Sequence, residues 1–560
     1  MIKMLIRTAL KQRIVVVVLA AVLFAFGLSA LQKLSVDAFP DVTNVLVQVA
    51  TEAPGRSPDE VERLVTVPIE IIMTGLPGLT EMRSLNRSGL SIITLVFTDS
   101  TDVYFARHLV LERLIEVADR LPSGITPVLG PVSTGLGEVY QYTLERPDDG
   151  TRPLTVAELT ERRTIQDWVV RPMLRNTPGV AEINSQGGFI KQYQVLVKPD
   201  RLRHYNIGGR QLFRALAVNN ANAGGGILPH YAEQYLIRGV GLIRNVEDIG
   251  NIVLKEVGAT PVYVRDVADV TIGHEVRQGA IVKNGRTEGV TGIVMMLRGG
   301  NAREVVGRVK AKVNEINKKG ILPGGLKIVP FYDRTELVDA ALHSVSKVLV
   351  EAVVLVIVLL FLFLGDIRSS LIVVATLLLS PLLTFMVMNH YNLSANLMSL
   401  GGLAIAIGLI VDGSVVVIEN AFRQLGQRPD QSQLRVVLDA ATEVGTPVLF
   451  GVGIIILVFL PLMSLQGMEG KMFAPLAYTV AIALVISLVL SLTLTPALSS
   501  YLLQGGKDHE TKLLAFLKKS YLKALHLALE RSWLTVLGAV GLLIAAVAVI
   551  PFLGKSFIRS

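Results

Sequence analysis

The sequence contains no cysteine, only two tryptophans and few charged residues. The absence of cysteine excludes disulfides, thiolate metal sites and cysteine nucleophiles. Any domain of this chain outside the cytoplasm must therefore be stabilised by its own hydrophobic core and not by disulfides. The eight histidines are scattered and include no HExxH or comparable metal-ligand spacing. Since no catalytic motif is present, we expect neither an enzyme nor a bound cofactor.

Charged residues make up 18% of the 560 residues, whereas soluble proteins carry about a quarter. The sequence instead contains long apolar runs, and a run of about eighteen or more apolar residues predicts a transmembrane helix. Such runs lie at 14–31, 345–364, 369–391, 395–418, 444–464, 473–503 and 533–553. The fold class predicted is therefore a polytopic α-helical membrane protein with a large extramembrane α+β domain between the first two spans.

The net charge of +8 follows the expected membrane topology. Four basic residues precede the first span, and the loops 365–368, 419–443 and 504–532 are rich in lysine and arginine, whereas 392–394 and 465–472 hold only Lys471. Because basic loops stay in the cytoplasm, the N-terminus is expected there and the large domain outside it. This distribution accounts for the excess charge, so we expect no nucleic-acid partner.

The large domain alternates strand and helix patterns and forms two units. The first comprises strands 44–51, 91–99 and 128–132 and helices 57–75 and 102–121. The second comprises strands 137–145, 181–187, 193–199, 289–297 and 326–333 and helices 155–175 and 301–319. Residues 205–275, rich in glycine and asparagine, interrupt it as an insertion with hairpins of its own. The order predicts two tandem βαββαβ units plus this insertion.

The fourth span contains two carboxylates within an otherwise apolar or small sequence. Spacings of three and four place one set of its residues on a single helix face: Gly401, Ala404, Gly408, Asp412, Val415 and Glu419. An acid at the centre of a span costs roughly 2.5–3.5 kcal/mol on insertion scales. Small residues allow a second helix to approach, so both acids are predicted to face a helix bundle and not lipid. Asp412 is then either a proton carrier reached by water or a fixed hydrogen-bonding residue between helices.

The fourth span, GLAIAIGLIVDGSVVVIENAFRQ (402–424), resembles the fourth-helix motif of resistance-nodulation-division (RND) efflux pumps. Other stretches resemble the same family: VDAFPDVTNVLVQVATEAPGRSPDEVE (36–62), STGLGEVYQY (133–142), GIVMMLRGGNAREVV (292–306), PFYDRTELVD (330–339) and GMEGKMFAPLAYTV (467–480). They cover the chain almost end to end and are most similar to the heavy-metal efflux branch.

This resemblance implies an inner-membrane antiporter that exchanges protons for metal cations, with Asp412 and Glu419 in the proton relay. It also implies a homotrimer, a periplasmic adaptor protein and an outer-membrane channel. The extramembrane units would be periplasmic porter subdomains and the insertion a docking domain. The metal would be the substrate and not a resident cofactor.

Several positions refine the resemblance. Multidrug members carry two adjacent acids in this helix, whereas Gly413 follows Asp412 here. Zinc- or cobalt-type members often have a further acid six residues before the central one, where this chain has Ala406. Candidate substrate ligands are Glu138, at a motif where some zinc-type members place acids, and three methionines that could offer thioethers to Cu(I): Met463, Met468 and Met472. Methionines that merely fill gaps are the alternative for these three.

A repeat predicts that the chain resembles the first half of such a pump. Ala-Leu, basic residues and an apolar span begin at Ala9 and again at Ala528, although any two transmembrane entries share some of this pattern. The other half, with the partners of Asp412, would then lie outside this chain. The predicted division is 1–35, first span; 36–135 and 136–335, porter subdomains; 336–503, spans two to six; 504–532, cytoplasmic amphipathic helix; and 533–560, seventh span and start of the second half.

Three functions remain open on these grounds. The chain could belong to a metal exporter, to a related exporter of drugs or lipids, or to a non-transporting membrane-anchored periplasmic interaction protein. The single acid followed by Gly413 favours the first over drug pumps.

Overall fold

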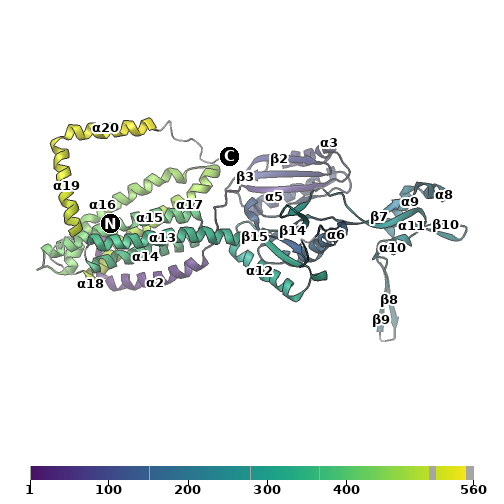
Figure 1. The fold of residues 1–560 in the computed structure, drawn as a ribbon, viewed down its shortest axis with the longest axis horizontal. Helices are drawn as coiled ribbons and strands as arrows, with labels where there is room; N and C mark the ends of the chain where they lie inside the picture. Colours follow the sequence, from purple (N-terminus) through teal and green to yellow (C-terminus); the bar gives the residue numbers. More distant parts are fainter. Residues whose placement is uncertain are drawn as a thin grey trace. The chain divides into compact units, whose positions relative to one another are not determined.

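The computed structural model describes residues 2–149, 152–231, 233–277, 279–364, 366–391, 393–503 and 512–549. These residues form two compact units (Figure 1). The membrane unit combines Met1–Val42 with Leu337–Ser560, and the αβ unit is Thr43–Glu336. Each is described separately below.

The membrane unit is helical, and within its described residues seven helical spans are long and apolar enough to cross a membrane, in agreement with the seven predicted spans. Its helices are α1 (Ile2–Lys11), α2 (Arg13–Lys33), α13 (Arg334–Leu364), α14 (Ile367–His390), α15 (Leu397–Gln427), α16 (Gln433–Met463), α17 (Gly467–Leu492), α18 (Leu494–Leu502), α19 (Lys512–Glu530) and α20 (Ser532–Val549). The sixth span is α17 and α18 together, broken at Thr493. The predicted residues 504–511 and 550–560 lie outside the described part, and a membrane-surface position for α19 stays a prediction.

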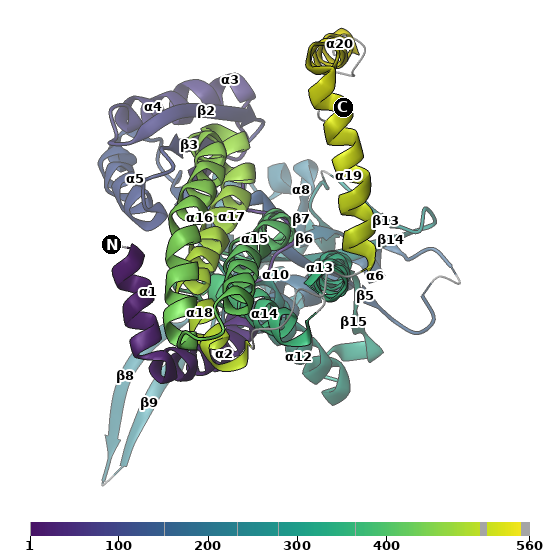
Figure 2. The same cartoon turned by 90° about the vertical axis from the view of Figure 1, so that its left-hand side faces the viewer.

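Helices α14 to α18 gather into one bundle, in which one side of α15 contacts each of the other four (Figure 2). The sequence permits this because glycines remove side chains where helices touch. A Cβ atom on Gly402 of α15 would lie 2.7 Å from the backbone oxygen of Leu476 in α17, and one on Gly27 of α2 would lie 2.8 Å from Cβ of Leu382 in α14. The N-terminal helix α1 packs on α16, where a Cβ on Gly445 would meet Ile2 and Ile6.

The first half of the αβ unit is a four-stranded sheet with helices on one face. Its strands are β1 (Val45–Glu52), β2 (Leu79–Arg87), β3 (Leu90–Phe97) and β4 (Pro127–Leu129), in the order β2-β3-β1-β4. Its helices are α3 (Pro58–Val61), a π-helical turn η1 (Glu62–Thr66), α4 (Val67–Met73) and α5 (Val103–Val117). The predicted βαββαβ order is confirmed, and β2 is a strand that the sequence interpretation did not identify.

The second half repeats this topology. Its sheet has the order β13-β14-β5-β15, with β6 also paired to β14. The strands are β5 (Glu138–Glu145), β6 (Val180–Gly187), β13 (Ile281–Lys283), β14 (Thr287–Met296) and β15 (Lys327–Asp333). The helices are α6 (Val156–Ile165), the π-helical turn η4 (Gln166–Val170), α7 (Arg171–Arg175) and α12 (Ala302–Lys319). Separate hydrophobic cores lie under the two sheets.

The strand predicted at 193–199 is not part of this second sheet. It is β7 (Lys191–Val197), which pairs with β12 (Ala268–His274) in a ribbon of its own that carries the insertion. Most of β7 is exposed, and β12 is exposed or half-buried beyond Ala268, so neither strand has the alternating burial that would indicate its partner. The insertion has its own small core and contains α8 (Pro199–His204), α9 (Gly209–Val218), α10 (Val246–Gly250), β10 (Val253–Val257), β11 (Thr260–Tyr263) and α11 (Val264–Val267).

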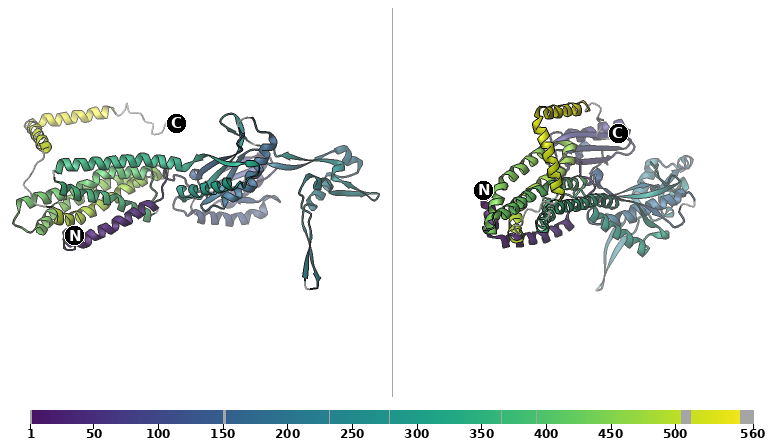
Figure 3. Two further views of the ribbon diagram at one scale, coloured as in Figure 1. Left: turned by 60° about the horizontal axis from the view of Figure 1, so that its bottom comes forward. Right: turned by 60° about the vertical axis from the view of Figure 1, so that its left-hand side comes forward.

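A hairpin extends away from the body of the insertion (Figure 3). It consists of β8 (Ala223–His230) and β9 (Glu233–Gly239), which pair only with each other among the described residues. Every residue of both strands is exposed. The predicted hairpins of the insertion are thereby confirmed. The domain boundaries given above stay predictions.

Candidate functional site

Helix α15 presents the two carboxylates. It begins at Asn396, whose side chain accepts hydrogen bonds from the backbone of Met398 and Ser399, both at 3.0 Å, as a capping residue should. Its 31 residues span about 46 Å at 1.5 Å per residue, enough to cross a bilayer. Asp412 lies midway between Leu397 and Gln427. Glu419 lies about two turns further along, toward the predicted cytoplasmic end.

The two acids lie on the side of α15 that the described helices leave uncovered. Asp412, Glu419 and Gly408 are exposed, whereas the apolar side formed by Leu403, Ile407, Ile410 and Val417 is buried. Among the described helices the two acids face away from the bundle, and their predicted contact with a further helix stays a prediction. Apolar character alone does not decide which side of α15 packs, because lipid is as apolar as leucine. Close contacts at Gly402 and Gly413 and the hydrogen bonds to Ser414 fix the covered side.

The glycines of α15 also fall into two groups, one on the packed side of the helix and one on the uncovered side. A Cβ atom on Gly413 would lie 3.2 Å from Cγ1 of Val448 in α16 and 3.3 Å from Oγ of Ser491 in α17, so this position is closely packed. At Gly401 and Gly408 a Cβ would meet nothing within 4 Å among the described residues, and Ala404 is half-buried. Their predicted role in admitting another helix stays a prediction. A second acid at position 413 would enter the bundle and not the face of Asp412.

Behind Asp412 lies a cluster of buried hydroxyl groups that the sequence interpretation did not single out. Ser414, two residues beyond Asp412, accepts hydrogen bonds from Thr376 of α14 and Thr495 of α18, each at 3.2 Å. Interhelical hydrogen bonds of this kind hold membrane helices together. The cluster ties the acid-bearing helix to two neighbours, and the hydroxyl at i+2 from an intramembrane acid could have indicated it.

A second polar contact joins α15 to α16 near the predicted cytoplasmic end. Glu443 of α16 accepts hydrogen bonds from Asn420 at 3.1 Å and from Gln424 at 2.6 Å. Asn420 also donates to the backbone oxygen of Ala440 at 2.9 Å. These contacts fix the rotation of α15 about its axis, and hence the side on which Asp412 and Glu419 appear.

Glu138, the candidate ligand in the αβ unit, is exposed at the start of β5. Its carboxylate accepts a hydrogen bond from Gln141 at 3.0 Å. Met295 of β14 is the register partner of Glu138, at an irregularity of the pairing between Val294 and Met295. Both residues lie at one end of the second sheet.

The three candidate methionines lie at one end of the α16–α17 pair. Met463 is the last residue of α16, and Met468 and Met472 lie one turn apart on α17. Met468 is exposed and the other two are half-buried. The structure therefore places all three around one short connection, and their role in binding metal stays a prediction.

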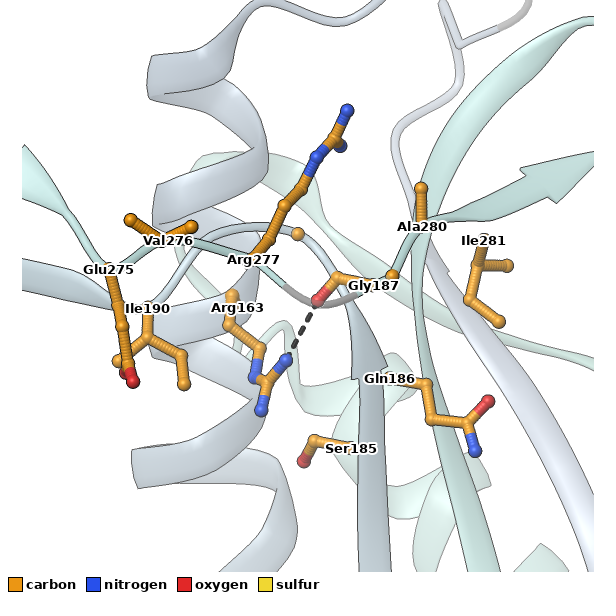
Figure 4. A pocket seen from close by; sticks show the side chains of 12 residues that line it. Arg163, Ser185, Gln186, Gly187, Ile190, Glu275, Val276, Arg277, Ala280 and Ile281 are labelled. Atoms are coloured by element: carbon orange, nitrogen blue, oxygen red, sulfur yellow. Dashed lines mark hydrogen bonds between the residues drawn. The ribbon is translucent and has the colours of Figure 1, made fainter. Parts of the chain in front are cut away.

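The αβ unit also contains a hollow at the root of the insertion (Figure 4). It has a volume of about 440 Å³ and is lined by Arg163, Arg277 and Glu275 together with several glycines. Arg163 donates to the backbone oxygen of Gly187 at 2.9 Å. Two guanidinium groups beside one carboxylate make this hollow unsuitable for a metal cation. Within the part of the chain that the structure describes, no group of three or more His, Asp or Glu side chains could hold a metal ion.

Comparison with known proteins identifies the fold. The profile of the AcrB/AcrD/AcrF family matches residues 5–560. The chain is 44% identical over 569 residues to the cation efflux system protein CzcA of Alcaligenes sp. (strain CT14), covering 100% of this chain and 53% of that protein. It is 38% identical over 542 residues to the cation efflux system protein CusA of Escherichia coli (strain K12), covering 94% of this chain and 51% of that protein.

A crystal structure of a heavy metal efflux pump (crystal form II) superposes with a TM-score of 0.84 at 34% identity, covering 99% of this chain and 53% of that chain. The chain spans about half the length of the curated relatives it matches. The resemblance drawn from the motifs is confirmed, and so is the predicted fold class of a helical membrane protein with a large α+β domain. The chain belongs to the AcrB/AcrD/AcrF family and, within it, has the fold of the RND heavy-metal pumps.

Proposed function

We propose that this chain is part of a proton-driven exporter of heavy-metal cations. The observation that carries the proposal is Asp412, a carboxylate midway along a membrane span and on its uncovered side. An intramembrane acid is costly and usually marks an ion or proton pathway. Relatives described as cation efflux proteins match 94–100% of the chain, which favours metal cations as the substrate.

In this mechanism Asp412 takes up a proton from the periplasmic side and releases it toward the cytoplasm. Glu419, on the same side of α15 and about two turns away, receives or passes on that proton through water. Another part of the full-length protein covers this side and supplies a cationic partner that changes position when Asp412 is protonated. The hydroxyl cluster around Ser414 then transmits the movement of α15 to α14 and α18.

The metal follows a separate route in the αβ unit, which we place in the periplasm. Glu138 and Met295 offer one oxygen and one sulfur ligand, and a complete site requires further ligands from elsewhere in the protein. Met463, Met468 and Met472 are candidate ligands at the periplasmic side of the membrane unit. We place the N-terminus in the cytoplasm because basic residues precede α2.

The exporter is proposed to work as a homotrimer with a periplasmic adaptor protein and an outer-membrane channel. The exposed β8–β9 hairpin supports an assembly of copies, because an isolated two-stranded hairpin is at best marginally stable in water. Packing against a second copy would stabilise it.

The test is Asp412→Asn in the full-length protein, expressed in a metal-sensitive host. We expect metal tolerance to fall to that of cells without the pump, while the amount and assembly of the protein in the membrane are unchanged. Asp439→Asn is the matched control, since Asp439 lies on α16 near Arg428, away from the uncovered side of α15. Unchanged tolerance of the Asp412→Asn strain would contradict the proton-relay assignment.

A panel of zinc, cobalt, cadmium, copper and silver salts identifies the ion. Tolerance to drugs without tolerance to any metal would favour the alternative exporter. Tolerance to neither would favour a non-transporting interaction protein.

A further inference from the structure

The two halves of the αβ unit share an irregularity in their first helical segment. In each, an α-helix passes into a π-helical turn and then continues as a short α-helix: η1 leads into α4, and η4 leads into α7. A proline stands two residues after the end of each π-turn, at Pro68 and Pro172. Rare π-turns at matching positions make the two segments equivalent residue by residue.

Three surface positions of this segment differ in character between the halves. In the first half they are Leu64, Val67 and Ile71, all exposed, with 63% of Ile71 accessible. The equivalent positions in the second half are Trp168, Arg171 and Arg175. We call these the apolar face and the Trp–Arg face. One chain carries each of them once.

The Trp–Arg face has the composition of a binding surface. Trp168 is 80% exposed, although tryptophan normally buries most of its large apolar surface. Beside it lies a hollow of about 780 Å³, lined also by Arg171, Pro172 and Arg175. Tryptophan and arginine are enriched among the residues that dominate binding at protein interfaces. Arg171 and Arg175 are held in place by Glu182, at 3.1 and 3.4 Å.

The apolar face complements it in both polarity and charge. Three neighbouring exposed aliphatic side chains lose contact with water when a partner covers them. Glu62 and Glu70 flank this face on the same segment, the first exposed and the second half-buried. The exposed Arg63 beside Glu62 pairs with Asp59 at 3.4 Å. Two carboxylates beside an apolar centre match two guanidinium groups beside a tryptophan.

We propose that the apolar face of one copy of this chain docks on the Trp–Arg face of a second copy. Both faces are exposed in the same αβ unit, so they do not cover each other within one chain. A contact between two different faces is head-to-tail, and such a contact closes into a ring when its rotation permits. The inference adds a specific contact to the proposed trimer and does not depend on the substrate that is transported.

The complete absence of cysteine makes this contact directly testable by cross-linking in membranes. In the full-length protein, depleted of any cysteine elsewhere, Ile71→Cys combined with Trp168→Cys should form covalent dimers and trimers with a short bis-maleimide. Each single variant should remain monomeric on a denaturing gel, and two differently tagged single variants expressed together should give dimers only. Leu64→Cys with Arg175→Cys is a second pair in case the first disturbs folding.

The control pair joins Ile71→Cys with Leu85→Cys, which is 56% exposed on β2 and lies outside both faces. Cross-linking of this control equal to that of the test pair would overturn the proposal. So would a trimer, seen by native mass spectrometry, in which neither test pair cross-links. The faces would then be covered by another part of the polypeptide or by a different protein.

Charge reversal supplies an independent measurement. Arg171→Glu with Arg175→Glu should reduce cross-linking of the Ile71–Trp168 pair to the level of single-cysteine variants. Adding Glu62→Lys and Glu70→Lys to the same chain should restore it, because the reversed charges attract again across the contact. Rescue would not follow if the arginines merely stabilised their own fold. Metal tolerance is measured separately, so the cross-linking result can be interpreted even if the transport proposal fails.

Discussion

At the scale of single residues, Arg162 places a positive charge inside the second half of the αβ unit, where 2% of its side chain is exposed. Asp149 neutralises it through two hydrogen bonds of 2.6 and 2.7 Å, and the backbone oxygen of Leu144 accepts a third at 3.1 Å. Burial alone would raise the pKa of Asp149. The hydrogen bonds from Arg162 and from the Arg146 backbone outweigh burial, so the pKa lies below its ordinary value of 3.8.

Asp149→Asn should lower the free energy of unfolding at pH 7 by roughly 3–5 kcal/mol, because it leaves a buried guanidinium without its counter-charge. The pKa of Asp149 is lower in the folded than in the unfolded protein. The pair's contribution is therefore fully present above the unfolded pKa and is lost as pH falls through the folded pKa. Thermal unfolding of the detergent-solubilised protein should show a difference between wild type and variant that is constant near neutral pH and narrows below about pH 4.

Asp200→Asn is the control for this prediction. Asp200 pairs with Arg203 on the surface, its side chain is 92% exposed, and exposed pairs contribute about 0–1 kcal/mol. An Asp149→Asn protein as stable as wild type at pH 7 would show that the buried pair adds nothing to stability.

At the scale of elements, the packing of α15 depends on Gly413. Gly413→Leu should separate α15 from α16 and α17, because even a Cβ atom there would lie 3.2 Å from Val448 and 3.3 Å from Ser491. Overpacking of this kind costs typically 1–3 kcal/mol. We expect a lower melting temperature in detergent and less protein in the membrane.

Gly451→Leu provides the comparison, since a Cβ on Gly451 of α16 would meet nothing within 4 Å among the described residues. Equal effects of the two substitutions would mean that Gly413 is not a special contact point. This would also remove the structural account of why glycine, and not a second acid, follows Asp412.

The elements differ in how far the sequence predicted them. The spans followed from composition alone, because a bilayer requires about 20 apolar residues whatever their partners are. Strand pairing depends on distant residues: β2 was not identified, and β7 was assigned to a sheet with which it does not pair. Helical periodicity correctly separated the apolar side of α15 from the side of Asp412. It did not show which side neighbouring helices cover, because that depends on helices far away in the sequence.

At the scale of the whole molecule, the β8–β9 hairpin contributes little to the chain that carries it. None of its residues belongs to the core of the insertion. The chain segments at its base are held together without it, since Asn222 accepts a hydrogen bond from the backbone of Gly241 and Asn220 one from that of Ile243, both at 3.2 Å. Replacing residues 223–239 with a short Gly-Ser turn should therefore leave both the insertion and the membrane unit folded.

The same deletion should weaken the proposed assembly of copies, because among the described residues β8 and β9 pair only with each other and we propose that a second copy covers them. We expect native mass spectrometry to show the purified full-length protein as a trimer and the deletion variant as a monomer. The melting temperature of the individual fold should be the same in both proteins. A second variant keeps the hairpin at full length but replaces Ile227, Leu236 and Ile237 with serine. Comparing it with the deletion shows whether the lost apolar side chains or the shortened chain weakens the assembly. A trimer that survives the deletion would assign assembly to other surfaces, among them the apolar and Trp–Arg faces. The cross-linking pairs would then report the principal contact between copies.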